Sequence, residues 1–150
     1  MLSRFRSFYA AWEPAADDTG DSLAPGLRTG RQKLPLIDDD VCYLGLQTVE
    51  RLPVYDAYGL AKWPVMLGSM YVVEGSTLGG QFIARELEQR LGLTGGFGYS
   101  YFLGYREATG SRWKEFGKQA EVLAESVPDQ SEIVEGAIKT FELFHTVLCR

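Results

Sequence analysis

The chain has 150 residues, with 15 basic and 20 acidic side chains and a formal net charge of -5. This length suits one domain with its own core, so we expect a single domain over residues 1–150. A hydrophobic share of 45% excludes a disordered chain, and the basic residues form no run suited to nucleic acid. Because no apolar stretch is long enough for a membrane span or a signal-peptide core, we expect a cytoplasmic protein without membrane contact.

The first part of the chain is expected to form two helices joined by a long connection. Apolar side chains recur at helical spacing from Leu2 to Trp12, and Pro14 is expected to end this first helix. Residues 15–35 mix Asp, Gly, Pro and Thr, which indicates an irregular connection. The acidic run at residues 38–40 favours the N-cap and first turn of a second helix carrying Val41, Leu44 and Leu46, which Leu52-Pro53 should end.

A longer helix is expected from Pro64 to Leu91, about 28 residues at helical periodicity, with Gly92 as its C-terminal cap. After a glycine- and tyrosine-rich loop from Gly95 to Gly104, another helix runs through Trp113 up to Val127-Pro128. Asp129 and Glu132 resemble a capping box for a last helix. The apolar stripe expected to be buried on that helix is Ile133, Ala137, Phe141, Phe144 and Leu148. No segment has a sustained period of two, so we predict an all-α fold.

Two features were assessed as metal sites. Cys42 and Cys149 lie outside any metal-ligand spacing and are expected to be reduced structural thiols. Helix capping is a commoner role than metal binding for an acidic triplet such as residues 38–40. We therefore expect no protein-held metal ion.

Three glycines, Gly75, Gly79 and Gly80, lie inside the long predicted helix, where each costs about 1 kcal/mol relative to alanine. Gly75 and Gly79 share one face, and Gly80 lies beside them, so the helix offers a strip of bare backbone that would also permit a bend. Close helix-on-helix packing is the usual reason for such spacing. A flat ligand lying against the backbone is the functional alternative, and glycines alone do not decide between the two.

The segment from Met66 to Gln81, MLGSMYVVEGSTLGGQ, resembles the distal helix of bacterial heme oxygenases, especially those associated with bacteriophytochromes. Further similarities are Tyr101-Phe102-x-Gly104-Tyr105, Thr109-Gly110, Trp113-x-x-Phe116 and Thr140-Phe141. The resemblance covers nearly the whole chain. It implies a multi-helical heme oxygenase-like fold in which heme lies between a proximal helix and this long kinked distal helix.

The resemblance also implies an activity and a site. Heme would be the ligand and substrate, cleaved with oxygen and an external electron donor to biliverdin, carbon monoxide and iron. The positions implied to contact heme are Tyr71, Gly75, Ser76, Gly79 and Gly80, of which Gly75 and Ser76 are the catalytic candidates. Many family members carry an aspartate where this chain has Ser76, whose hydroxyl would hold one water.

The chain departs from the family pattern at its N-terminus. In the family the iron-ligating proximal histidine lies on a helix that precedes the position matched by Met1, so we expect that helix to be missing here, and His145 is the only histidine of the sequence. A lone histidine on a mixed helix face is usually structural or solvent-facing, although neutral imidazole is a normal heme ligand. Without the proximal helix, apolar surface along residues 64–91 should be uncovered, so we expect either a rearranged helix or a partner subunit, as in a homodimer, to cover it.

Several interpretations stay open at this point. The chain is a heme oxygenase, a non-catalytic relative that binds a tetrapyrrole or associates with a partner, or a shortened version of a longer protein. Glu74 is either a buried carboxylate or a surface group. The tyrosines at 99, 101 and 105 either reach the heme carboxylates or pack with their hydroxyls at the surface.

Overall fold

The computed structural model describes residues 1–48 and 59–149, and no strand occurs among them. The prediction of an all-α fold is therefore confirmed. The helices are α1 (Leu2–Leu23), α2 (Leu34–Tyr43), α3 (Trp63–Leu91), the short α4 (Ser100–Leu103), the 3-10 turn η2 (Arg106–Ala108), α5 (Thr109–Glu125) and α6 (Ser131–Cys149). The helix break predicted at Leu52-Pro53 lies outside the described residues.

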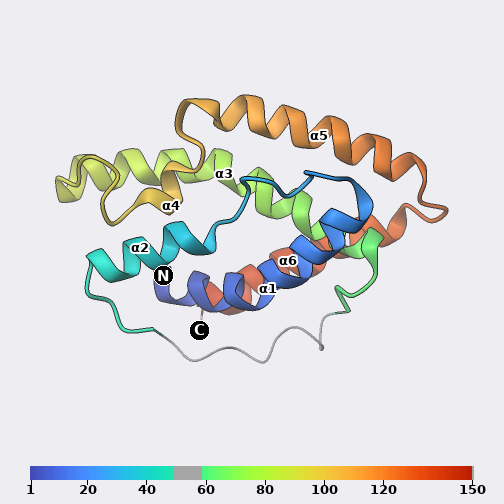
Figure 1. The fold of residues 1–150 in the computed structure, drawn as a ribbon. Coiled ribbons are helices and arrows are strands. Elements are labelled where there is room, and N and C mark those ends of the chain that lie inside the picture. The colour runs from blue at the N-terminus through green and yellow to red at the C-terminus, as the bar shows by residue number, and fades with distance from the viewer. Residues whose placement is uncertain (49–58, 150) are drawn as a thin grey trace.

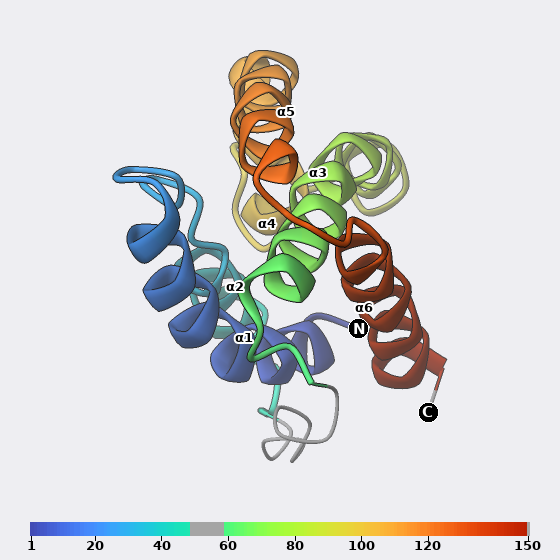
Figure 2. The ribbon, with the colours of Figure 1, turned by 90° about the vertical axis from the view of Figure 1, so that its right-hand side faces the viewer.

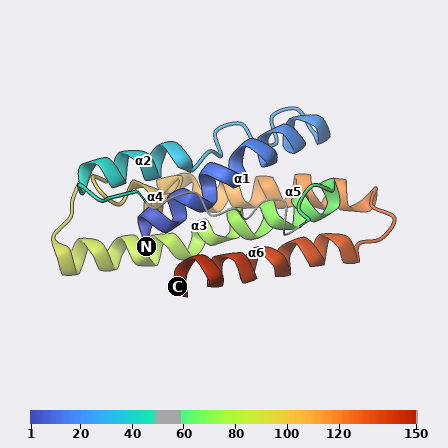
Figure 3. The same ribbon diagram turned by 90° about the horizontal axis from the view of Figure 1, so that it is seen from below.

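Helix α3 is the centre of the arrangement and packs against α1, α4, α5 and α6. Seen along the bundle, α1 and α2 lie on one side of α3, α6 on the other, and α5 across a third side (Figure 2). Helices α3 and α6 lie side by side and run in the same direction (Figures 1 and 3). None of the described helices combines the length and apolar character needed to cross a bilayer.

The first helix extends beyond its predicted end. Helix α1 continues through Pro14 to Leu23. The predicted irregular connection at residues 15–35 is therefore wrong at residues 15–23, which belong to α1, and at residues 34–35, which begin α2. Pro14 faces solvent, while Ala16 and Gly20 continue the buried stripe of Phe5, Phe8 and Trp12. Packing of this stripe offsets the backbone hydrogen bond that proline cannot make.

The second helix begins earlier than predicted. Helix α2 starts at Leu34, with proline in its first turn, so the acidic run at residues 38–40 lies in its middle, past the first turn. Leu44 is already its C-cap. The prediction that these aspartates cap α2 is wrong. Asp40 is buried and instead accepts hydrogen bonds from the backbone N–H groups of Ser100 (2.8 Å) and Tyr101 (2.9 Å) at the start of α4. The carboxylate stabilises a helix start, but one distant in sequence.

The third predicted helix is confirmed at both ends, since α3 spans Trp63–Leu91 and Gly92 caps it in the left-handed conformation at φ 66°. The predicted kink at its glycines stays a prediction. Helix α6 also exists as predicted, and Asp129 accepts the Ser131 backbone N–H at 3.0 Å. Its predicted stripe is half-buried at Ile133, Ala137, Phe144 and Leu148 and wrong at Phe141, which is 63% exposed. The fully buried positions are Gly136, Thr140, Leu143 and Val147.

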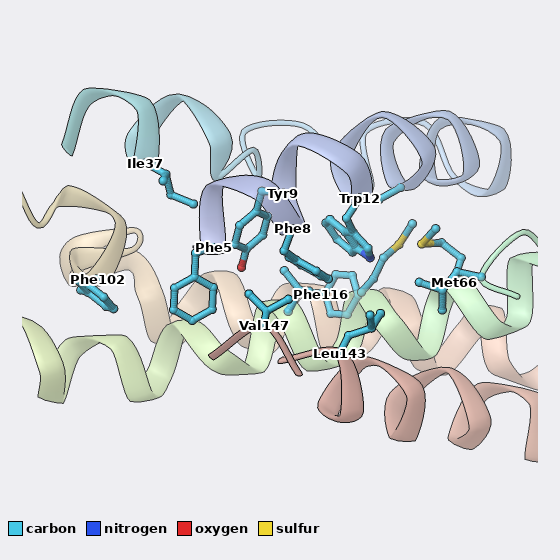
Figure 4. Close-up of a cluster of buried hydrophobic side chains, with 14 of the residues drawn as sticks. Phe5, Phe8, Tyr9, Trp12, Ile37, Met66, Phe102, Phe116, Leu143 and Val147 are labelled. Atoms are coloured by element: carbon cyan, nitrogen blue, oxygen red, sulfur yellow. The ribbon is translucent and has the colours of Figure 1, made fainter. Parts of the chain in front are cut away.

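The core fills the space between α1, α3 and α6 (Figure 4). Aromatic side chains of α1 point toward α3 and α6, where Phe8 lies 4.9 Å from Phe144 between ring centroids. Ser69 joins all three helices, because its hydroxyl bonds to the Trp12 indole N–H at 2.8 Å and to the Thr140 hydroxyl at 2.6 Å.

The closest approach of α3 to α6 depends on Gly68 and Gly136. A Cβ atom at Gly68 would lie 1.8 Å from the Ile133 carbonyl oxygen, and one at Gly136 would lie 1.8 Å from the Val65 carbonyl oxygen. Side chains at these two positions are therefore incompatible with the observed packing. Close helix packing is thus the role of Gly68, about two turns before the predicted ligand-binding strip on α3, and of Gly136 on α6.

Candidate functional site

Two cavities flank the glycine-containing part of α3. The first, about 290 Å³, lies toward α1 and α4 and is lined by Ser76, Gly79 and Gly80 together with aromatic side chains from α1, α4 and α6. The second, about 380 Å³, lies toward α5 and α6 and is lined by Tyr71, Gly75 and Ser76. Ser76 and Phe144 line both. We call the first the α1-side cavity and the second the α5-side cavity.

The three glycines of α3 have different surroundings. A Cβ atom at Gly79 would meet nothing within 4 Å, so this position borders open space. At Gly80 it would lie 2.9 Å from the Phe102 carbonyl oxygen, and at Gly75 3.4 Å from the Trp113 ring. Gly80 is therefore explained by the close approach of α4, and Gly75 lies against α5. Gly79 is the position where bare backbone faces a cavity without an internal packing reason.

Hydroxyl groups line the wall of the α1-side cavity next to Ser76. The Ser76 hydroxyl donates to the Val73 carbonyl at 2.7 Å, and Tyr101 lines the same cavity. The hydroxyls of Tyr9 and Tyr101 are 3.1 Å apart. Burial raises the pKa of Tyr101 to about 12 and that of Tyr9 well above its usual value, so both phenols stay protonated at neutral pH.

A buried ionic cluster lies beside this wall, around Glu74. The Glu74 carboxylate is fully buried and accepts hydrogen bonds from Arg31 at 2.8 Å and from the Tyr105 hydroxyl at 2.8 Å. Arg28 and Lys33 approach the same carboxylate at 3.9 and 3.8 Å. Of the two possibilities for Glu74, the structure therefore gives the buried carboxylate.

Three of these groups come from the short segment between α1 and α2. Arg28 packs its aliphatic part on Gly20, where a Cβ atom would lie 2.3 Å away, and its guanidinium lies 4.9 Å from the Trp12 ring centroid. Lys33 is 1% exposed, lines the α1-side cavity and donates to the Tyr105 hydroxyl at 2.6 Å. Burial lowers the pKa of Lys33 to about 8, against the opposing attraction of Glu74.

The predicted site residues are divided between the two cavities. Gly79 and Gly80 line the α1-side cavity, Tyr71 and Gly75 line the α5-side cavity, and Ser76 lies between them. Tyr71 is 49% exposed and packs on the Trp113 ring at 4.9 Å between centroids. The residues are thus brought to one stretch of α3 but not to one face.

Sequence reasoning missed Lys33, Arg31 and Tyr9 as parts of this site. Arg31 and Lys33 were treated as polar residues of a loop, whereas both are buried. The buried cluster of basic residues is paired with an acidic residue 43 positions away from Arg31, which local patterns do not reveal. Tyr9 was assigned only to the apolar stripe of α1, although its hydroxyl faces Tyr101.

His145 does not join either cavity. It is exposed on α6, and the residues that line the α1-side and α5-side cavities do not include it. Among the described residues, no group of three or more His, Cys, Asp or Glu side chains could hold a metal ion. The two cysteines, Cys42 and Cys149, are exposed and not bonded to each other.

Comparison with known proteins places the chain in a class. The family model described as heme oxygenase matches residues 47–150, more than two thirds of the chain. A protein named heme oxygenase from Xanthomonas campestris pv. campestris (strain 8004) is 30% identical over 149 residues, covering 99% of this chain and 86% of that protein. No solved structure matches the chain. The chain therefore belongs to the heme oxygenase family, and the family resemblance inferred from the α3 sequence is confirmed.

Proposed function

We propose that this protein binds heme against the glycine-containing stretch of α3 and acts as a heme oxygenase, opening the ring to biliverdin, carbon monoxide and iron. The observation that carries the proposal is Gly79, where a family-typical glycine faces a cavity and has no packing partner. A glycine retained without a packing reason in a helix interior has a cost, which a ligand lying on its backbone would offset.

The residues around Gly79 suit a flat apolar ring. The α1-side cavity is lined by Phe5, Phe102, Phe144 and Ile83, and its lining is mostly aromatic or aliphatic. Such a surface with a few polar groups is typical of cofactor and ligand sites. The α5-side cavity continues this apolar surface beyond Ser76 and Phe144, which line both. The two cavities together border α3 from Tyr71 to Ile83.

Bound heme would supply the oxygen chemistry that opens its own ring, with electrons from an external donor. The protein's part is to position and to shield. Gly79 lets the ring approach the helix backbone, Phe144 and Phe5 exclude water, and the hydroxyls of Ser76 and Tyr101 supply hydrogen bonds at the cavity wall. The proposal uses no side chain of this chain as axial ligand, because His145 is exposed and lies outside both cavities.

The direct test is single-turnover cleavage. Purified protein is loaded with one equivalent of hemin and reduced with ascorbate in air, and the absorption spectrum is followed together with carbon monoxide release. The proposal predicts loss of the Soret band, appearance of a biliverdin band and about one equivalent of carbon monoxide. Saturable hemin binding without these products would remove the enzymatic part of the proposal and leave a heme-binding protein. Absence of saturable binding would remove both parts.

We also propose that the protein is a cytoplasmic homodimer. Large apolar side chains are exposed along α3 among the described residues: Tyr71, Leu78, Phe82, Ile83 and Leu91. A second copy would cover them. Light scattering after size-exclusion chromatography should give twice the chain's mass of 16.7 kDa, and a mass of one chain at all concentrations would contradict the dimer.

A further inference from the structure

Lys33 is the charged side chain of the α1-side cavity. Among the described residues lining that cavity, the others are glycine, hydroxyl-bearing, aromatic or aliphatic. The Lys33 side chain is almost fully buried, and its ammonium group donates a hydrogen bond to the Tyr105 hydroxyl at 2.6 Å. A buried cation in an apolar cavity wall is costly unless it meets negative charge.

Three buried basic side chains, one of them Lys33, surround the carboxylate of Glu74. Arg28, Arg31 and Lys33 are each no more than 2% exposed, and all three lie within 4 Å of the single carboxylate of Glu74. The other carboxylates paired with the two arginines are those of Asp17 and Glu115, whose side chains are 33% and 54% exposed. The buried part of the cluster therefore has three basic side chains and two carboxylates, those of Glu74 and Glu13.

The hydrogen bonds show the same shortage of acceptors. Both terminal nitrogens of Arg28 are buried and have no hydrogen-bond partner. Glu13, the other buried carboxylate nearby, accepts the backbone N–H groups of Lys33 and Leu34 and not a cationic side chain. Arg31 is the close partner of Glu74 at 2.8 Å, while Lys33 stays at 3.8 Å. Arg31 is therefore the principal partner of Glu74, and the Lys33 ammonium, which donates one hydrogen bond to Tyr105, has further N–H groups for an acceptor bound in the cavity that Lys33 lines.

We propose that Lys33 is an anion-binding residue of the α1-side cavity, which takes a negatively charged group of the flat ligand, with Tyr105 and Glu74 as positioning residues. The inference rests on the proposed heme-binding function and adds a recognition element to the same site. The anionic group that Lys33 binds is either a carboxylate on the rim of the ring or a small anion at its centre. An ammonium donating to either forms a charge-assisted hydrogen bond.

Only the charged form of Lys33 can act in this way. Glu74 and Glu13 favour the charged form, while burial and the neighbouring Arg28 and Arg31 oppose it, and the balance lowers the Lys33 pKa to about 8. Tyr105, Tyr101 and Tyr9 stay protonated in this range because burial raises each pKa. The residue is therefore cationic at pH 6.5 and neutral at pH 9.5, whereas ring carboxylates stay ionised throughout.

The experiment uses iron-free protoporphyrin IX and its uncharged dimethyl ester as probes, titrated by fluorescence against the full chain. If a rim carboxylate is the partner, the acid binds the wild type about tenfold more tightly than the ester at pH 6.5, and Lys33→Met removes this preference. The preference should also disappear in the wild type at pH 9.5. Lys33→Arg, whose guanidinium stays charged, should keep it at both pH values.

A second arm tests an anion at the ring centre. Fluoride is titrated into the hemin complex at pH 6.5, and a central partner predicts about tenfold weaker fluoride binding in Lys33→Met than in the wild type. Lys118→Met, an exposed lysine that lines a different cavity on α5, is the matched control and should behave as wild type in both arms. The wild-type pH series needs no variant to fold, so it tests the rim carboxylate even if Lys33→Met is unstable. The fluoride arm can then use Lys33→Arg, which should bind fluoride as the wild type does at pH 6.5 and more tightly than the wild type at pH 9.5.

The outcomes separate the two proposals. Equal affinities for acid and ester in the wild type at both pH values, with fluoride binding unchanged by Lys33→Met, would overturn the role of Lys33 and leave heme binding intact. Failure of hemin and of both porphyrins to bind the wild type would overturn the proposed function and this inference with it.

Discussion

The two halves of α3 use glycine in opposite ways. In the first half, Gly68 has no room for a side chain, because a Cβ atom would lie 1.8 Å from the Ile133 carbonyl oxygen of α6. In the second half, Gly79 has nothing within 4 Å of a Cβ atom and borders the α1-side cavity. Glycine on this helix therefore allows close packing against α6 at one position and leaves bare backbone beside a cavity at the other.

This difference shows that a glycine strip in a helix is not by itself evidence for a ligand. Gly68 and Gly136 have the role usually expected for small residues in helices, and Gly80 belongs with them because of its approach to Phe102. Among the glycines of α3, Gly79 alone has no atom within 4 Å of an added Cβ atom and borders the α1-side cavity. Space next to the missing side chain, rather than the spacing of glycines, separates the two roles.

Glu74 lies at the boundary between the two halves, and its substitution should have the largest effect on stability. Glu74→Gln removes the negative charge that Arg28, Arg31 and Lys33 share, so we expect the free energy of unfolding to fall by about 3–5 kcal/mol. Glu115→Gln, which removes a half-exposed partner of Arg31, should cost less than about 1 kcal/mol. Urea unfolding followed by circular dichroism measures both, and similar losses would mean that the cluster does not depend on Glu74.

The packed half is tested by Gly68→Ala. One methyl group there must displace the backbone of α6, so we expect a loss of about 3 kcal/mol in the free energy of unfolding. Gly117→Ala, in the middle of α5 with nothing within 4 Å, is the matched control and should be stabilising. Equal stability of Gly68→Ala and the wild type in thermal melts would show that α3 and α6 are not this close in solution.

The open half should respond in the opposite direction. Gly79→Ala adds a methyl group into free space and improves helix propensity, so we expect a gain of about 0.5–1 kcal/mol in the free energy of unfolding. For a chain of this size, each kcal/mol of added stability raises Tm by about 2–4 °C. A clear destabilisation in differential scanning calorimetry would indicate that Gly79 is packed after all.

Local sequence signals predicted the elements whose ends are determined locally. Pro64 near the start and Gly92 at the end of α3 act through their own backbone conformations, and both predictions are confirmed. Pro14 and the acidic run at 38–40 gave wrong boundaries because tertiary contacts prevail there. The buried stripe carries α1 past its proline, and Asp40 caps α4 instead of its own helix.

The burial of α6 and the ionic part of the site were not predictable in the same way. The face of α6 that meets α3 includes Gly136 and Thr140, which carry no hydrophobic signal, so the larger Phe141 was wrongly expected to be buried. Lys33 acquires its surroundings from Glu74 on a helix distant in sequence. Predicting such a site requires the fold first, whereas the glycine motif of α3 is readable directly from the sequence.

The central claim is that heme lies on the open half of α3, and a hemin titration of two matched variants tests it most directly. Gly79→Leu and Gly117→Leu each place a large side chain where nothing lies within 4 Å, but only the first fills the α1-side cavity. We predict that Gly117→Leu retains the saturable one-to-one Soret shift of the wild type and that Gly79→Leu weakens it at least about tenfold, with both variants folded by circular dichroism. Equal hemin affinity in both variants would contradict a heme site at Gly79.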